Sequence, residues 1–158
     1  MSSSHNLQHA KIDLKPHWIL VAITALMLAV YLYLCHYTGA QWQQDIPEEQ
    51  RVIIRTVFYI LAIIGFPMTN LIRHIQLRLN QTMPGDKSAK NRYLLTIIVS
   101  MTLAESIGIM GFVMYLLGDD FNTLYIFIVL SALAIYLYRP KMHEYLSILE
   151  ALAEHEQE

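Results

Sequence analysis

One acidic residue, Glu105, lies near the centre of a long apolar run over residues 93–117. A helix of about 20 apolar residues crosses a hydrocarbon core about 30 Å thick, so the run predicts a membrane span with its carboxyl at mid-depth. An ionised carboxylate at that depth costs about 2.5 to 3.5 kcal/mol, and holding the group protonated at neutral pH costs a comparable amount. A neighbouring cation or hydrogen-bond donor therefore decides its protonation state.

Two hydroxyl groups accompany this carboxyl. Thr102 lies about one helical turn before Glu105, and Ser106 directly follows it. Both side chains offer oxygen atoms that can help to bind a proton or a sodium ion. We therefore predict an ion site at Glu105 that includes Ser106 and Thr102, with H⁺ or Na⁺ as the only expected cofactor.

A second apolar run, over 51–75, supplies a further oxygen. Pro67 has no N–H to donate, so the carbonyl oxygen of Ile63 loses its partner within the helix. Ile63 falls at the same predicted depth as Glu105, and Gly65 leaves room for close contact. We hypothesise that the Ile63 carbonyl oxygen accepts a hydrogen bond from protonated Glu105, or that the two oxygens share a cation.

Small residues line one side of the Glu105 helix. Such residues at intervals of four let a second helix approach closely. An alternative to ion binding therefore stays open, in which Glu105 is a neutral acid that specifies helix packing. The predicted packing face consists of Ser100, Ala104, Gly108 and Gly111, with Gly65 and Pro67 contributing from the run over 51–75.

The segment Leu-Ala-Glu-Ser-Ile-Gly-Ile-Met-Gly-Phe-Val, from Leu103 to Val113, resembles the carboxylate-bearing helix of the proteolipid c subunits of rotary ATP synthases and V-type ATPases. In that family the glutamate binds a proton or sodium ion at mid-membrane, and a following serine is a ligand in sodium-binding members. The resemblance thus implies ion-binding roles for Glu105 and Ser106. The helix over 51–75 departs from the family pattern, because it has a single glycine where the family's partner helix is glycine-rich.

The whole chain has the composition of a membrane protein. Its 158 residues are 55% hydrophobic, with a mean hydropathy of +0.37, which suits four crossings with short connections. The predicted fold is all-α: a polytopic transmembrane four-helix bundle over 17–138, with a C-terminal cytoplasmic amphipathic helix. The predicted spans are about 17–37, 51–75, 93–117 and 121–138.

The two ends of the chain differ from the spans. Residues 1–16 are predicted to form a flexible cytoplasmic lead, and the run after them is longer than a usual signal core, which favours an uncleaved first helix. The acidic tail over 142–158 has one apolar stripe. It is predicted either to dock on the basic segment 73–92 or a partner, or to remain a solvated helix.

Charge placement predicts the orientation. Nine of the eleven basic residues flank one side of the spans, so the positive-inside rule predicts that both termini lie in the cytoplasm. The membrane is expected to be a bacterial inner membrane. The sequence lacks the stripe of basic residues interleaved with aromatic residues that is typical of nucleic-acid binding, so no nucleic-acid partner is predicted. The spans contain no histidine and carboxylate at metal-binding spacing, so no metal site is predicted.

No motif indicates an enzyme, and no catalytic residue is predicted. The expected function is that of a structural or accessory membrane subunit, with the bilayer and either further copies or another membrane protein as partners. Association would use the face of Ser100, Ala104, Gly108 and Gly111. The alternative is a proteolipid-like protein that binds a proton or sodium at Glu105.

Overall fold

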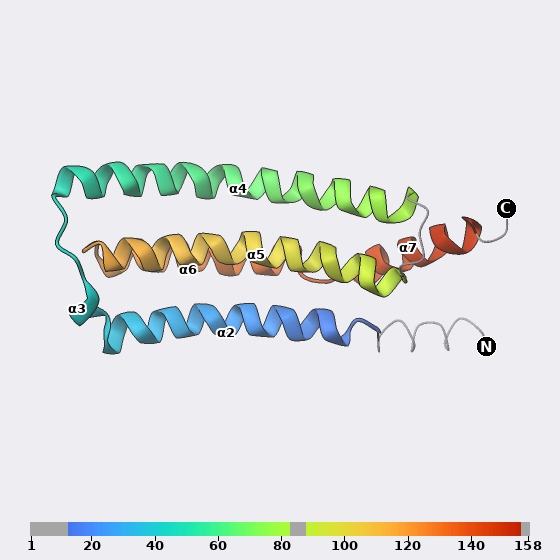
Figure 1. Ribbon diagram of the computed structural model, residues 1–158, viewed down its shortest axis with the longest axis horizontal. Coiled ribbons are helices and arrows are strands. Elements are labelled where there is room, and N and C mark those ends of the chain that lie inside the picture. Colours follow the sequence, from blue (N-terminus) through green and yellow to red (C-terminus); the bar gives the residue numbers. More distant parts are fainter. Residues whose placement is uncertain (1–12, 83–87, 156–158) are drawn as a thin grey trace.

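The computed structural model of the chain describes residues 13–82 and 88–155 (Figure 1). All regular structure in these two ranges is helical, which confirms the all-α prediction. Most of the predicted lead, and the last residues of the tail, lie outside the described residues. The helices are α2 (Lys15–Tyr37), α3 (Gly39–Trp42), α4 (Glu48–Thr82), α5 (Ala89–Leu116), α6 (Phe121–Tyr138) and α7 (Met142–His155).

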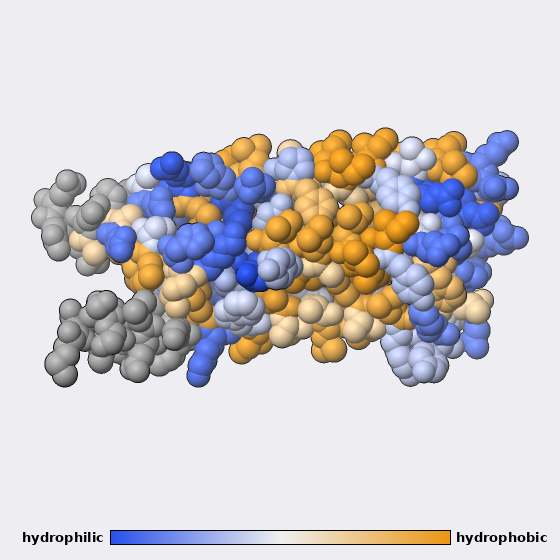
Figure 2. All heavy atoms as spheres, turned by 180° about the vertical axis from the view of Figure 1, so that it is seen from behind, coloured by the Kyte–Doolittle hydropathy of each residue, from blue (hydrophilic) through white to orange (hydrophobic). Residues whose placement is uncertain are grey.

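Four helices, α2, α4, α5 and α6, are long and apolar enough to cross a membrane. Figure 2 shows an apolar band across the middle of the molecule, with hydrophilic residues toward both ends. This distribution matches a hydrocarbon core between two polar interfaces. The prediction of a membrane protein with four apolar helices therefore agrees with the length, composition and surface of the helices.

Helix α5 is the centre of the arrangement. Helix α6 packs along its length, while α2 and α4 lie on opposite sides of it (Figure 1). The first described residues and α7 lie at one end of the bundle, here called the terminal end. The other end, with α3 and the turn between α5 and α6, is called the loop end.

Helices α4 and α5 are longer than their predicted spans. Helix α4 continues to Thr82, and α5 already begins at Ala89. Hydropathy marks only the apolar part of a helix, but Gln, Leu and Arg after residue 75 are good helix formers and continue α4 as far as the segment before Pro84. The polar connection predicted over 76–92 is thus mostly helical.

Acidic residues at the loop end hold the turn between α5 and α6. Asp119 Oδ1 lies 3.1 Å from Arg55 Nη1 on α4, and Arg51 Nη1 donates to the Gly118 carbonyl oxygen at 2.8 Å. Gly118 has a φ of +87°, a conformation that favours glycine. Asp120 caps α6 by accepting from the Thr123 N–H at 3.0 Å.

The acidic tail docks inside the chain. Helix α7 packs on α4 and α5, and Gln81 Nε2 of α4 donates to Ser147 Oγ at 3.0 Å. The structure therefore shows the docked alternative, on the basic segment predicted to receive the tail. The predicted apolar stripe consisted of Met142, Tyr145, Leu146, Leu149 and Leu152. The buried side of α7 is rotated from it, because Ile148 is buried and Leu149 is exposed.

Candidate functional site

The Glu105 carboxyl lies near the middle of the bundle. Its neighbour Ala104 accepts a hydrogen bond from Ser131 Oγ at 2.7 Å, and Ser131 is the eleventh of the 18 residues of α6. Because α6 is about as long as a membrane core is thick, this contact places Glu105 far from both ends of the apolar band. The depth predicted from the sequence therefore agrees with the neighbouring helix.

A tyrosine of α2 binds this carboxyl. Tyr31 Oη donates to Glu105 Oε1 at 2.9 Å. The Tyr31 ring also stacks on Phe112, with ring centroids 5.3 Å apart, so contacts with α5 position the ring as well as its hydroxyl. Tyr31 is one of ten tyrosines in the chain, and nothing in its spacing indicated a contact with Glu105.

The carboxyl opens onto an exposed stripe of α5. Glu105 is only partly buried, and the described residues give its Oε2 atom no hydrogen bond. Residues three or four positions apart share one side of a helix, and those in line with Glu105 are exposed. We call this the open face of α5: Leu95, Ile98, Thr102, Glu105 and Ile109.

The two predicted hydroxyl ligands do not converge on Glu105. Ser106 Oγ donates to the Leu103 carbonyl oxygen of its own helix at 2.7 Å. Thr102 is exposed on the open face, one turn away. Among the described residues, Tyr31 therefore provides the hydroxyl that binds the carboxyl.

The hypothesis for Ile63 concerns its backbone carbonyl oxygen. No hydrogen bond joins this oxygen to Glu105 in the described chain, and the contact stays a prediction. Pro67 does lie inside α4, as predicted, and the adjacent Phe66 carbonyl oxygen accepts from Tyr138 Oη at 2.8 Å. Gly65 faces α5, since a Cβ there would lie 4.0 Å from Ile107 Cδ1.

The small residues of α5 pack within the chain. We call Ser100, Ala104, Gly108 and Gly111 the closed face, because all four are buried. A Cβ on Gly111 would lie 2.5 Å from Phe127 Cβ of α6, and one on Gly108 would lie 2.5 Å from Leu28 Cδ2 of α2. The close helix approach predicted for this face is thus made with α6 and α2 of the same chain, which leaves the face covered.

A buried ion pair at the terminal end was not foreseen. Arg73 Nη2 of α4 lies 2.6 Å from Glu144 Oε2 of α7, with side chains only 5% and 12% exposed. Arg73 Nη1 also donates to the Tyr138 carbonyl oxygen at 2.8 Å and to Ser100 Oγ at 3.2 Å. Tyr93 Oη donates to Glu144 Oε2 at 2.8 Å. These contacts tie α4, α5, α6 and α7 together.

Sequence reasoning counted Arg73 as a flanking positive charge and Glu144 as one of five acidic tail residues. Docking of the tail on segment 73–92 was one predicted alternative, but the charge pattern did not say which basic residue would pair with which glutamate. Next to this pair, burial and a hydrogen bond to Asp13 raise the pKa of Tyr145 to about 12. Asp13 thereby joins the start of α2 to α7.

His17 lies in the same region. It is fully buried, its ring centroid lies 5.2 Å from that of Tyr93, and neither ring nitrogen has a hydrogen-bond partner in the described chain. Its surroundings are aromatic and do not form a ligand set. The described residues contain no group of three or more histidine, cysteine, aspartate or glutamate side chains that could hold a metal ion.

Two carboxyl sites thus stand out in the described chain. Glu144 is enclosed by an arginine and a tyrosine, whereas Glu105 is bound by one tyrosine and borders an exposed face. Comparison of the chain with protein-family models, with curated proteins and with solved structures gave no match. The candidate functional site therefore rests on the Tyr31–Glu105 pair and the open face around it.

Proposed function

We propose that this chain is a small membrane protein that assembles with a second copy of itself through the open face of α5. The observation that carries the proposal is the Glu105 carboxyl, which borders the exposed side chains of the open face and has one oxygen bound by Tyr31. In a bilayer, an exposed carboxyl gains from a hydrogen-bond partner on another helix. The role is that of a structural or accessory subunit.

A second copy suits this face. Two copies inserted in the same direction are related by a two-fold axis along the membrane normal, which brings identical residues together at the same depth. A protonated carboxyl both donates and accepts hydrogen bonds, so two Glu105 side chains satisfy each other. Leu95, Ile98 and Ile109 supply apolar contacts on either side. The closed face is not used, since α6 and α2 cover it.

We further propose that the terminal end faces the cytoplasm of a bacterial inner membrane. Of the described basic residues, Lys15, Arg73, Arg78, Lys90, Arg92, Arg139 and Lys141 belong to this end, whereas Arg51 and Arg55 contact the turn at the loop end. An excess of Lys and Arg at one side favours retention of that side in the cytoplasm.

Disulfide cross-linking tests the assembly. Cysteines are introduced singly at Ile98, Thr102 and Ile109 in a Cys35→Ala background, with Val129→Cys on α6 as the control, because Val129 is 65% exposed on another surface. Oxidation in membranes is expected to give dimers from the three α5 positions and none from Val129. Equal yields at all four positions, or dimers from Val129 alone, would contradict the proposal.

A second candidate function is binding of a proton or sodium ion at Glu105. The Tyr31 hydroxyl, 2.9 Å from the carboxyl, supports it, as does the resemblance of residues 103–113 to proteolipid c subunits. A hydrophobic carbodiimide reacts with protonated carboxyls that lipid can reach. Labelling that varies with pH around neutrality, or that sodium blocks, supports this function, with Glu105→Gln as the blank. Complete resistance to labelling at every pH would contradict it.

A further inference from the structure

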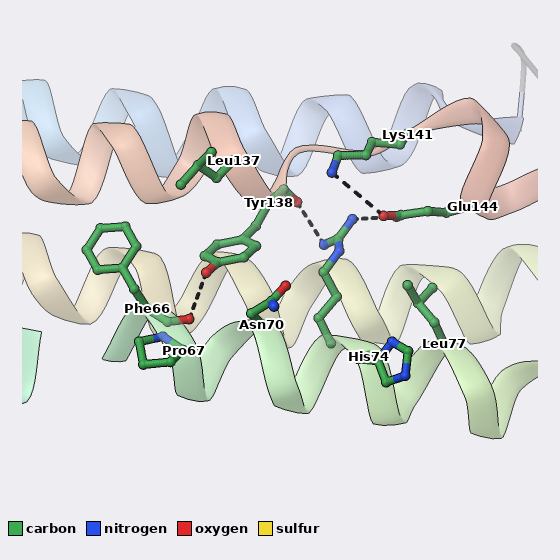
Figure 3. Close-up of a pocket in the computed structure, with 10 residues that line it drawn as sticks. Phe66, Pro67, Asn70, His74, Leu77, Leu137, Tyr138, Lys141 and Glu144 are labelled. Atoms are coloured by element: carbon green, nitrogen blue, oxygen red, sulfur yellow. Dashed lines mark hydrogen bonds and ion pairs between the residues drawn. The ribbon is translucent and has the colours of Figure 1, made fainter. Parts of the chain in front are cut away.

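A cavity of about 530 Å³ lies at the terminal end, between α4, the end of α6 and the start of α7 (Figure 3). Its lining has two chemical halves. Phe66, Pro67 and Leu137 are apolar, whereas Asn70, His74 and Lys141 carry polar groups. The cavity is distinct from the Glu105 site, which borders α2 and the open face of α5.

Arg73 also lines this cavity, and one of its donors is unused. Its side chain is only 5% exposed, and its Nε has no hydrogen-bond partner in the described chain, although both terminal nitrogens are bonded. A guanidinium stays charged at any ordinary pH, and a buried donor without a partner costs about 1 to 3 kcal/mol. Arg73 therefore adds a fixed positive charge to the wall of the cavity.

The charges indicate an anion. Glu144 lies 2.6 Å from Arg73 Nη2 and 3.9 Å from Lys141 Nζ, so one carboxylate faces two cations. His74, exposed on the same wall, adds a ring N–H. The lining thus keeps an excess positive charge and free donors, which suits a phosphate group.

The position of the cavity indicates that this phosphate belongs to a lipid. Helix α6 ends at Tyr138, and Arg139 and Lys141 follow at once, so the polar half lies where the apolar span gives way to the headgroup region. Phe66, Pro67 and Leu137 lie on the side toward the membrane centre. An anion without acyl chains would leave this apolar half without contacts.

We propose that the cavity binds the phosphate group of an anionic phospholipid, with Lys141 and His74 around the phosphate beside the Arg73 guanidinium, and an acyl chain along Phe66 and Leu137. Because Arg73 also holds Glu144, a lipid in the cavity contacts the residues that attach α7 to the bundle.

Native mass spectrometry of the full chain released from detergent tests this proposal. The probes are dioctanoyl phosphatidylglycerol, dioctanoylglycerol, which has the same chains without a phosphate, and inorganic phosphate. We expect a complex with one phosphatidylglycerol, at least about tenfold tighter than the complex with either other probe, which corresponds to about 1.4 kcal/mol. Equal binding of dioctanoylglycerol, or saturation by inorganic phosphate alone, would overturn the proposal.

Variants locate the site. His74→Ala with Lys141→Gln is expected to weaken phosphatidylglycerol binding about tenfold, whereas Arg78→Gln removes an exposed charge of the same helix that does not line the cavity and is expected to leave binding unchanged. Leu137→Trp fills the apolar half without changing any charge and should also abolish the complex. Equal losses in Arg78→Gln and the double variant, or full binding by Leu137→Trp, would refute a site in this cavity.

Discussion

Glu144 and Glu105 are two carboxyl groups that share one kind of hydrogen-bond donor but differ in burial and in nearby charge. Each accepts a hydrogen bond from a tyrosine, Glu144 from Tyr93 at 2.8 Å and Glu105 from Tyr31 at 2.9 Å. Glu144 has in addition the Arg73 guanidinium at 2.6 Å, whereas the described chain gives Glu105 no cation. A carboxylate whose partners all come from its own chain stabilises the fold. A carboxyl without a full set of partners in its own chain is available to bind a second molecule.

The strongest test of this difference between the two carboxyls is to remove the nearer cation, Arg73, from Glu144. Arg73→Met leaves the buried carboxylate with only Lys141 Nζ, 3.9 Å away, as a charge partner, and breaking a buried ion pair in this way costs about 3 to 5 kcal/mol. We expect that loss in the free energy of unfolding, measured by titration with sodium dodecyl sulfate in mixed micelles.

Arg78→Met is the control, because Arg78 lies on the same helix and is exposed. It should change the free energy of unfolding by less than about 0.5 kcal/mol. Similar stability of the two variants would mean that the ion pair adds nothing to the fold.

The closed and open faces of α5 differ in the same sense, and Gly111 on the closed face tests this. Gly111→Val places a Cβ 2.5 Å from Phe127 Cβ and 3.3 Å from the Leu124 carbonyl oxygen. Such overpacking typically costs about 1 to 3 kcal/mol, which we expect in the same unfolding titration. Ile109→Val on the open face should cost less, because Ile109 is exposed, and the reverse order would contradict the assignment of the two faces.

The two tyrosines allow a matched comparison. Tyr93→Phe removes a hydroxyl that donates to Glu144 and also accepts from the Lys141 N–H at 2.8 Å, so buried groups lose their partners at a cost of about 1 to 3 kcal/mol. Tyr31→Phe removes one hydrogen bond between membrane helices, worth about 0.6 kcal/mol on average. Stability measurements should therefore rank Tyr93→Phe as the more damaging change. A larger loss in Tyr31→Phe would show that Glu105 depends on its own chain as Glu144 does.

The smallest effect on the monomer is expected from Glu105 itself. Glu105→Gln keeps the size of the side chain and leaves an acceptor for Tyr31, so the free energy of unfolding should change by less than about 0.5 kcal/mol. Glu105→Leu removes both the donor and the acceptor from the proposed interface and should lower the yield of the Thr102→Cys cross-link, because an amide still provides both but leucine provides neither. A large loss of stability with an unchanged cross-link would assign Glu105 to the fold of the single chain.

The sequence allowed the apolar helices to be predicted, because they depend on hydropathy along a continuous segment. It did not allow the partners of Glu105 to be predicted, since Tyr31 lies 74 positions away and several tyrosines looked equivalent. Small residues on α5 correctly indicated close packing, but spacing alone does not say whether the second helix belongs to the same chain. Arg73 looked like a boundary charge because its acceptors lie on three other helices.

The arrangement of the helices has a consequence for the order of events during synthesis. Helices α2 and α4 both pack chiefly on α5 and lie on opposite sides of it, so the first two spans to leave the ribosome have no shared packing surface until the third follows. Arg73 meets its carboxylate partner late, because Glu144 is made 71 residues after it. The hydrogen bond between Asp13 and Tyr145 spans 132 residues, so both contacts form only when α7 has emerged.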